Sequence, residues 1–182
     1  MPDTNLILRE EIEGLFRKAH IALTTEERER LEFADFGFGV DNIRKEGLQL
    51  IVYCNNERYC AKDMALLPNQ TCPEHRHPPK KNDAEGKMET FRCRYGKVYL
   101  YVEGNATESL SVEIPEKHKK WYTVRHEIVL HAGQQYTIPP NTRHWFQAGE
   151  KGAIVSEFSS PSDDASDIFT NPKIQRVAVD RV

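Results

Sequence analysis

The chain has 182 residues, 38% of them hydrophobic and 29% charged, and its formal net charge is −3. The length suits one domain with a single buried core, and the composition argues against a disordered chain. Because basic and acidic residues are interspersed rather than blocked, the sequence offers no electrostatic surface for nucleic acid or for an anionic membrane. A small neutral ligand is the expected partner.

Targeting and cysteine patterns favour a cytoplasmic protein. The longest apolar stretches, such as LQLIVYC, are too short to span a bilayer, and the N-terminal residues lack a charged region followed by an apolar core. No CxxC pair is present among Cys54, Cys60, Cys72 and Cys93, which do not resemble a disulfide scaffold. We expect reduced, mostly buried cysteines.

The first 45 residues are predicted to form a helical extension packed on the rest of a single domain, residues 1–182. Ile12, Leu15 and Phe16 recur at helical spacing, and Thr24 is followed three residues later by Glu27, which is a capping-box pattern. Two short helices are therefore expected before any strand.

From about residue 48 the hydrophobic pattern has a period of two, which is typical of strands. The strand-like segments are LQLIVYC, RYCAKDMALL, METFRCR, KVYLYVEG, EIVLHAG, QYTIPP, HWFQAG and AIVSEFSS, and the turn-forming segments are NNE, PNQ, YGK, EGN and AGE. Strands at this spacing, without helices between them, predict a mainly all-β fold, an antiparallel barrel or sandwich.

Three further segments are predicted to lie at the edges of this fold. HPPKKNDAEGK is a polar loop, and IPEKHKKWYT is a second excursion that could overhang the barrel mouth; both could border a pocket. The tail KIQRVAVDRV could add an edge strand or cross to a partner subunit.

Two histidines in CPEHRHPP have the spacing of a bidentate metal ligand. Residues i and i+2 of a strand project from the same face, so His75 and His77 can present their imidazoles to one point. An HxH pair alone is weak evidence, because such pairs are often exposed or satisfied by ordinary hydrogen bonds.

A charged pair precedes the apolar face of the next strand. Lys87 and Glu89 share a face with Phe91 and Cys93, and a carboxylate on an apolar face is costly to bury unless it meets a cation or a metal. The alternative is a surface ion pair between Lys87 and Glu89. A third element, His144, begins a later apolar strand, where a lone histidine is more often a core residue than a ligand.

Together these residues resemble the two motifs of the cupins. The first is His75-x-His77, then Glu89 and six residues to Gly96; the second is Gly133, five residues, Pro139, and then Asn141 to His144. Two departures are that Glu89 follows His77 by twelve positions instead of four or five, and that the first glycine of the first motif is missing. Glu74 and Glu85 are therefore alternatives to Glu89. The resemblance implies a cupin-type antiparallel β-barrel (jelly roll).

The stretches CPEHRHPP, EGKMETFRCRYGKVYLYVEG and YTIPPNTRHWFQAGEKGAIVSEFSS are similar to the compact bacterial D-lyxose isomerases of the cupin superfamily. This resemblance implies that His75, His77, Glu89 and His144 bind a divalent ion, most commonly Mn²⁺, with Lys87 and Glu157 catalytic and Asp167 contacting the substrate. It also implies a homodimer. The ligand set itself suits Mn²⁺, Fe²⁺, Co²⁺ or Zn²⁺.

The expected activity is the interconversion of D-lyxose and D-xylulose, and also of D-mannose and D-fructose, by proton transfer through a cis-enediol. A metal-assisted hydride shift is the competing mechanism. Two other functions stay open from the sequence: a cupin oxygenase that uses Fe²⁺, and a sugar-binding cupin without catalysis.

Overall fold

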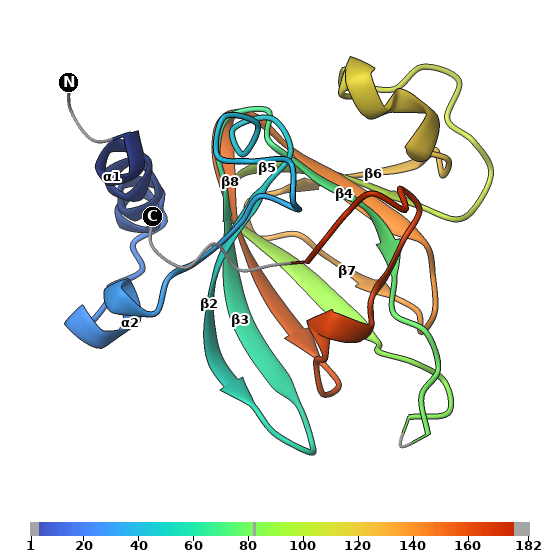
Figure 1. Ribbon diagram of the computed structural model, residues 1–182, viewed down its shortest axis with the longest axis horizontal. Helices are drawn as coiled ribbons and strands as arrows, with labels where there is room; N and C mark the ends of the chain where they lie inside the picture. The colour runs from blue at the N-terminus through green and yellow to red at the C-terminus, as the bar shows by residue number, and fades with distance from the viewer. Residues whose placement is uncertain (1–3, 82, 177–182) are drawn as a thin grey trace.

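The computed structural model describes residues 4–81 and 83–176, which form a curled, mostly antiparallel sheet with helices against its outer side (Figure 1). No helix in this part of the chain is long and apolar enough to cross a membrane. The helices are α1 (Thr4–Lys18), α2 (Thr25–Glu29), and the 3₁₀ helices η1 (Glu116–Trp121) and η2 (Asp164–Ser166). The strands are β1 (Glu32–Ala34), β2 (Leu48–Asn55), β3 (Cys60–Leu66), β4 (Thr71–Arg76), β5 (Glu89–Val102), β6 (His126–His131), β7 (Gln135–Ile138), β8 (His144–Ser159) and β9 (Ile168–Phe169).

The two expected N-terminal helices are confirmed. The apolar stripe of α1, which includes Ile12 and Phe16, is buried in one cluster with Ala65 of β3 and Ile154 of β8. The capping box at the start of α2 is also present, with both reciprocal hydrogen bonds between Thr24 and Glu27. The same strands pack against α1 on one face and against the barrel core on the other. We therefore propose that the chain is one domain.

The expected break of two long strands at YGK and AGE is wrong. β5 and β8 each run through these segments, and irregular register near Gly96 and residues 149–152 bends the pair instead of ending it. Gly96 has a φ of 71°, and a Cβ there would lie 2.0 Å from the Gly152 carbonyl oxygen. Glycine thus permits a close backbone contact inside a continuous strand pair.

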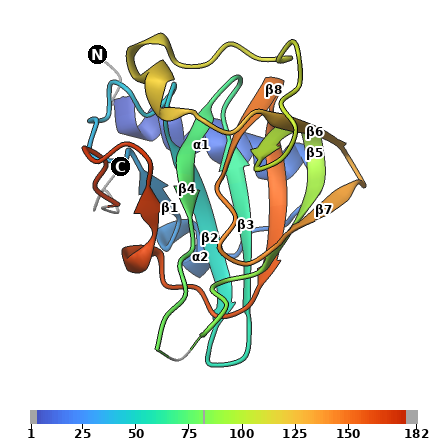
Figure 2. The same ribbon diagram turned by 90° about the vertical axis from the view of Figure 1, so that its right-hand side faces the viewer.

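The sheet curls on itself (Figure 2), and side chains from β2, β3, β4, β5, β8 and β9 line one cavity. β8 is central, because its first half pairs with β4 and its second half with β3, while β5 pairs along its whole length. The registers place His75 opposite His144, and place Glu157 between Lys62 of β3 and Phe91 of β5. The barrel core fills the space behind these residues, with Cys93, Leu100, Phe146 and Val155 among its members.

The three edge segments lie in different parts of the fold. The loop before β5 contributes His77 and Lys87 to the central cavity, as expected. The excursion at 114–123 forms η1 and borders a pocket, as expected, but this is a separate surface groove and not the central cavity. Residues 160–176 supply part of the cavity wall, and β9 pairs with β4. The tail forms no strand through residue 176, and the rest of it lies outside the described residues.

Candidate metal and sugar site

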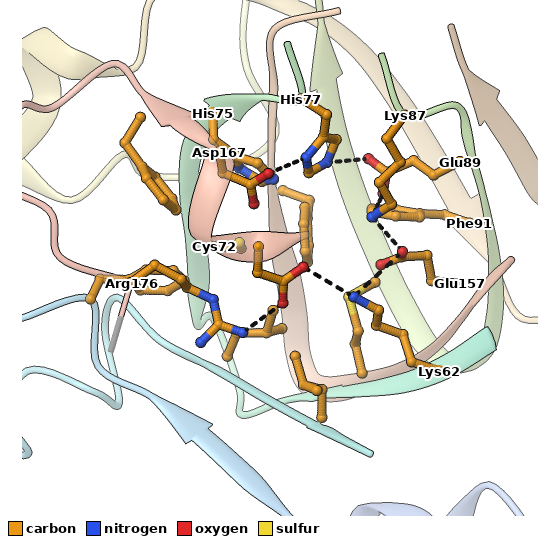
Figure 3. Close-up of a pocket in the computed structure, with 17 residues that line it drawn as sticks. Lys62, Cys72, His75, His77, Lys87, Glu89, Phe91, Glu157, Asp167 and Arg176 are labelled. Carbon is orange, nitrogen blue, oxygen red and sulfur yellow. Dashed lines mark hydrogen bonds and ion pairs between the residues drawn. The ribbon is translucent and has the colours of Figure 1, made fainter. Parts of the chain in front are cut away.

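His75 and His77 line one end of the central cavity (Figure 3), and His144 lies beside them. His75 lies in β4, His77 follows its last residue, and His144 begins β8; one ring nitrogen of each lies within 4.8 Å of the others. The Nδ1 atoms of His75 and His144 donate to the carbonyl oxygens of Pro73 and Thr142, at 2.8 and 2.9 Å. Since a carbonyl only accepts, these bonds fix the tautomer and leave both Nε2 lone pairs free to bind a metal.

Glu89 completes the group. Its Oε1 lies 2.9 Å from His144 Nε2 and 3.2 Å from His77 Nε2. Two ligand atoms with bonds of roughly 2.1 Å at a right angle are roughly 3.0 Å apart, so these separations match neighbouring ligands of one ion. His144 Nε2 is buried, yet it makes no hydrogen bond to the described residues. Buried polar atoms normally have a partner, so this nitrogen is a candidate metal ligand.

The two alternatives to Glu89 are excluded by their positions. The Glu74 carboxylate accepts hydrogen bonds from the Thr123 and Val124 backbones and from the hydroxyls of Thr123 and Thr170, so its oxygens are already occupied. Glu85 is exposed in the loop before β5. Of the three carboxylates, only Glu89 meets the histidines within the described residues.

Burial and charge act in opposite directions on this group. Burial, together with its histidine neighbours, lowers the pKa of His75 well below its usual value, so this ring is neutral as a ligand must be. Burial alone would also lower the pKa of His77, but Glu89 and Asp167 outweigh it and raise that pKa to about 9. Burial would raise the pKa of Glu89, but Lys87 and the histidines hold it well below its usual value, which keeps Glu89 ionised.

Lys87 and Glu157 form a buried ion pair directly beside the histidines. Lys87 Nζ lies 2.5 Å from Glu157 Oε1 and 2.8 Å from Glu89 Oε2, and both Lys87 and Glu157 side chains are only 4% exposed. Burial alone would lower the pKa of Lys87, but the two carboxylates outweigh it and raise the pKa above its usual value. The pair therefore places an ammonium donor and a carboxylate acceptor at one wall of the cavity.

Asp167, expected from the resemblance to contact the substrate, lies against a histidine. Its Oδ1 is 2.5 Å from His77 Nδ1, and its side chain also lines the cavity. A carboxylate at the outer nitrogen of a metal-binding histidine orients the ring and increases its basicity. Its second oxygen would still be available to a ligand.

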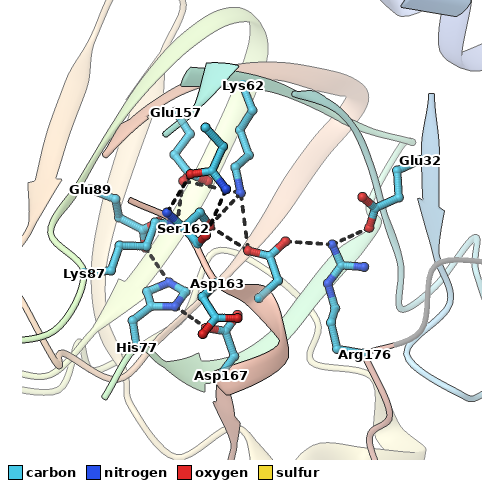
Figure 4. A network of polar contacts seen from close by, with 12 residues as sticks. Glu32, Lys62, His77, Lys87, Glu89, Glu157, Ser162, Asp163, Asp167 and Arg176 are labelled. Atoms are coloured by element: carbon cyan, nitrogen blue, oxygen red, sulfur yellow. Dashed lines mark hydrogen bonds and ion pairs between the residues drawn. The ribbon is translucent and has the colours of Figure 1, made fainter. Parts of the chain in front are cut away.

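The cavity is also lined by three charged residues that the sequence did not single out, Lys62, Asp164 and Arg176. Figure 4 shows Lys62 and Arg176 in the polar network beside Glu157. Lys62 shares the inward face of β3 with Cys60 and Met64, which are buried. A lysine within an apolar alternation is the same signal that marked Glu89, and it could have identified Lys62. Asp164 and Arg176 follow the last long strand, where the sequence has no periodic pattern to place them.

The cavity is narrow in this structure, with about 30 Å³ of free space. The polar groups described above line it together with the apolar side chains of Phe36, Leu48, Leu50 and Met64. The polar and apolar linings together suit a compact molecule that carries several hydroxyl groups.

The sequence matches known proteins along most of its length. A model of the D-lyxose isomerase family matches residues 25–180. The chain belongs to the D-lyxose isomerase family.

Its relatives in this family are close. It is 61% identical to the D-lyxose/D-mannose isomerase of Thermosediminibacter oceani over 93% of this chain and 92% of the relative. It is 59% identical to the D-lyxose ketol-isomerase of Cohnella laeviribosi over 94% and 92%. Among solved structures, the L-ribose isomerase of Cellulomonas parahominis aligns with a TM-score of 0.77, covering 96% of this chain and 95% of that one, at 16% identity. That likeness confirms the cupin-like fold.

Proposed function

We propose that this D-lyxose isomerase family member interconverts D-lyxose and D-xylulose, and also D-mannose and D-fructose. The observation that carries the proposal is the buried Lys87–Glu157 pair, which lines the same cavity as the histidine group. The activities named for the relatives support it. Family membership also argues against the Fe²⁺ oxygenase and the non-catalytic sugar-binding protein.

The proposed ligands of a divalent ion are His75, His77, Glu89 and His144. Three imidazoles and one carboxylate suit several first-row metals, and we propose Mn²⁺, with Co²⁺, Fe²⁺ and Zn²⁺ as alternatives. When bound, such an ion polarises the sugar carbonyl and stabilises negative charge on its oxygen. The orphaned Nε2 of His144 and the close approach of Glu89 support this ligand set.

The proposed reaction is a proton transfer by Glu157 and Lys87. Glu157 removes the proton from C2 of the aldose, and the electron pair of the broken C–H bond forms the C1–C2 double bond of a cis-enediol. Lys87 gives a proton to the O1 oxygen as the carbonyl bond opens. The proton on Glu157 exchanges with solvent, Glu157 then gives a proton to C1, and Lys87 recovers one from O2 as the ketone forms. All atoms balance, because an aldose and its ketose are isomers.

The ion pair suits both roles before substrate arrives. Lys87 Nζ lies 2.5 Å from Glu157 Oε1, and the two neighbouring carboxylates hold Lys87 as an ammonium by raising its pKa. The buried position of the pair excludes bulk water, which strengthens its interaction with charge that develops on the sugar. A hydride shift would need neither group to exchange a proton with carbon, so solvent deuterium in the product would argue against it.

The experiment that tests this function is metal-dependent turnover of a panel of aldoses. The protein is stripped with a chelator, reloaded with Mn²⁺, and incubated with D-lyxose, D-mannose, D-xylose and D-ribose, with the stripped protein as control. Fastest conversion of D-lyxose, followed by D-mannose, supports the proposal. Failure to convert any of the four sugars with stoichiometric metal bound would refute it.

We also propose that the active form is a cytoplasmic homodimer. Open sheet edges such as β6 and β7 favour association with another copy, because their unpaired backbone groups can bind a further strand. Closed symmetric dimers are the commonest oligomers. Sedimentation velocity tests the oligomeric state, since a dimer has twice the monomer mass of 21.0 kDa. A single species at the monomer mass under assay conditions would contradict the dimer.

A further inference from the structure

A second lysine lines the cavity without a part in the proton transfer described above. Lys62 points inward from β3, and its side chain is only 4% exposed. The burial of an ammonium group is costly, so a buried lysine needs partners that compensate for its lost hydration. Its partners show what the position is suited to do.

The contacts of Lys62 leave donor capacity directed into the cavity. Its Nζ donates to Ser162 Oγ at 3.2 Å and lies 3.5 Å from Asp164 Oδ1. Glu157 Oε1 is 3.7 Å away, which is beyond hydrogen-bond distance. An ammonium group has three N–H donors, and these contacts use at most two of them, one at 3.2 Å and one at the 3.5 Å limit.

Asp164 is held firmly beside Lys62. Ser162 donates to its Oδ1 at 2.7 Å, and Arg176 binds its Oδ2 at 3.1 Å (Figure 4). Arg176 is anchored in turn to Glu32 of β1 at 2.6 Å. The result is a fixed cation and a fixed anion next to each other in the cavity wall. A sugar hydroxyl can accept from one of these groups and donate to the other, and fixed partners reduce the entropy cost of binding it.

The position of this pair separates it from the reacting carbons. Lys87 lies between Glu89 and Glu157, whereas Lys62 lies on the opposite side of Glu157, on the neighbouring strand (Figure 3). If Glu157 acts at C1 and C2, the chain of the sugar continues past it toward Lys62. We propose that Lys62, supported by Asp164, binds a hydroxyl of the sugar beyond C2 and thereby positions C2 against Glu157.

This inference rests on the proposed function, and a rival role for Lys62 is purely electrostatic. In that role the Lys62 ammonium stabilises the charge of Glu157 and makes no contact with the sugar. The two roles differ in their dependence on the sugar hydroxyls. A hydrogen bond to one hydroxyl is lost when either partner is removed, whereas an electrostatic effect on Glu157 is the same for every substrate.

The test is a cycle of enzyme and substrate changes. Manganese-loaded wild type and Lys62→Met are compared on D-lyxose and on its 3-deoxy, 4-deoxy and 5-deoxy analogues, by kcat/KM. Both enzymes see the same substrates, so differences in the open-chain fraction cancel within the cycle. Loss of a hydrogen bond to a charged group costs on the order of tenfold to a hundredfold. We expect the kcat/KM of Lys62→Met to be lower than that of wild type by this factor on D-lyxose. On the analogue that lacks the bound hydroxyl, the two enzymes should have almost the same kcat/KM.

Several measurements keep the outcomes distinct. Lys151→Met, an exposed lysine on β8, is the matched control and should leave every rate unchanged. If Lys62→Met is too unstable, the double variant Lys62→Met/Asp164→Asn removes both charges of the pair and enters the same cycle. An equal loss on D-lyxose and on all three analogues would overturn the inference while the isomerase function stands. Wild type that fails to convert D-lyxose would refute the proposed function itself.

Discussion

Replacement of Glu157 by glutamine is the most informative change to the reaction machinery. The amide keeps the shape of the side chain but cannot take a proton from carbon, so kcat should fall by about 10²- to 10⁴-fold, the usual contribution of a general base. Metal content should stay the same, because Glu157 is not among the proposed ligands.

The cost in stability can be estimated from the same contacts. A buried ion pair that loses one partner costs about 3–5 kcal/mol when the remaining charge is left alone. Here Lys87 keeps Glu89 at 2.8 Å and Lys62 keeps Asp164 at 3.5 Å, so each ammonium retains a carboxylate. We therefore expect a smaller loss of roughly 2 kcal/mol in the free energy of unfolding, which lowers Tm by about 4–8 °C for a chain of this size.

Steady-state turnover of D-lyxose, metal analysis of the purified variant and thermal unfolding measure the three quantities. Glu150→Gln is the matched control, because Glu150 lies exposed on the same strand and should change none of them. Turnover of Glu157→Gln at the wild-type rate, with full metal content, would refute the assignment of Glu157 as the base.

Three other changes test the supporting structure. Asp167→Asn should weaken Mn²⁺ affinity by about 10- to 100-fold in a metal titration, because it removes the charge behind His77; unchanged affinity would contradict that role. Chiefly because of Lys62 and Arg176, and against the effect of burial, the pKa of Asp164 lies below its usual 3.8, so its stabilisation is complete above that pH and lost as pH falls. The Tm deficit of Asp164→Asn should therefore stay constant from pH 7 to about pH 4.5 and shrink only as the pH falls below 3.8, and a deficit that stays the same down to about pH 2 would contradict this. Gly96→Ala should cost more than about 2 kcal/mol, whereas Gly133→Ala, with a φ of 90° but open space around it, should cost less; equal losses in urea unfolding would contradict the close contact.

Local patterns predicted much of the fold. The helical spacing of Ile12 and Phe16 and the capping box at Thr24 depend on neighbours in sequence, so one chain suffices to find them. The strand segments follow from alternation in the same way. The continuity of β5 and β8 did not follow, because YGK and AGE have the composition of turns. Only the approach of the two backbones at Gly96 and Gly152 makes them parts of long strands.

Site residues could be predicted from the sequence where the pattern that marks them lies within a few neighbouring residues. His75 and His77 form a motif by themselves, and Glu89 stands out on an apolar face. The contact of Asp167 with His77 joins residues 90 positions apart, so spacing cannot reveal it. Arg176 reaches the cavity only because the segment after β8 folds back over the barrel. Lys62 had a readable signal, since its neighbours on the inward face of β3 are apolar.

The central claim is that a metal-supported Lys87–Glu157 pair moves a proton between C2 and C1 of an aldose. The most direct test is to incubate the Mn²⁺-loaded and the chelator-stripped protein with D-lyxose in D₂O, and to follow D-xylulose formation and deuterium at C1 by NMR. We predict conversion only in the metal-loaded sample, with deuterium at C1 of the ketose. Equal conversion without metal, conversion without deuterium at C1, or no conversion in a fully loaded sample would contradict the account.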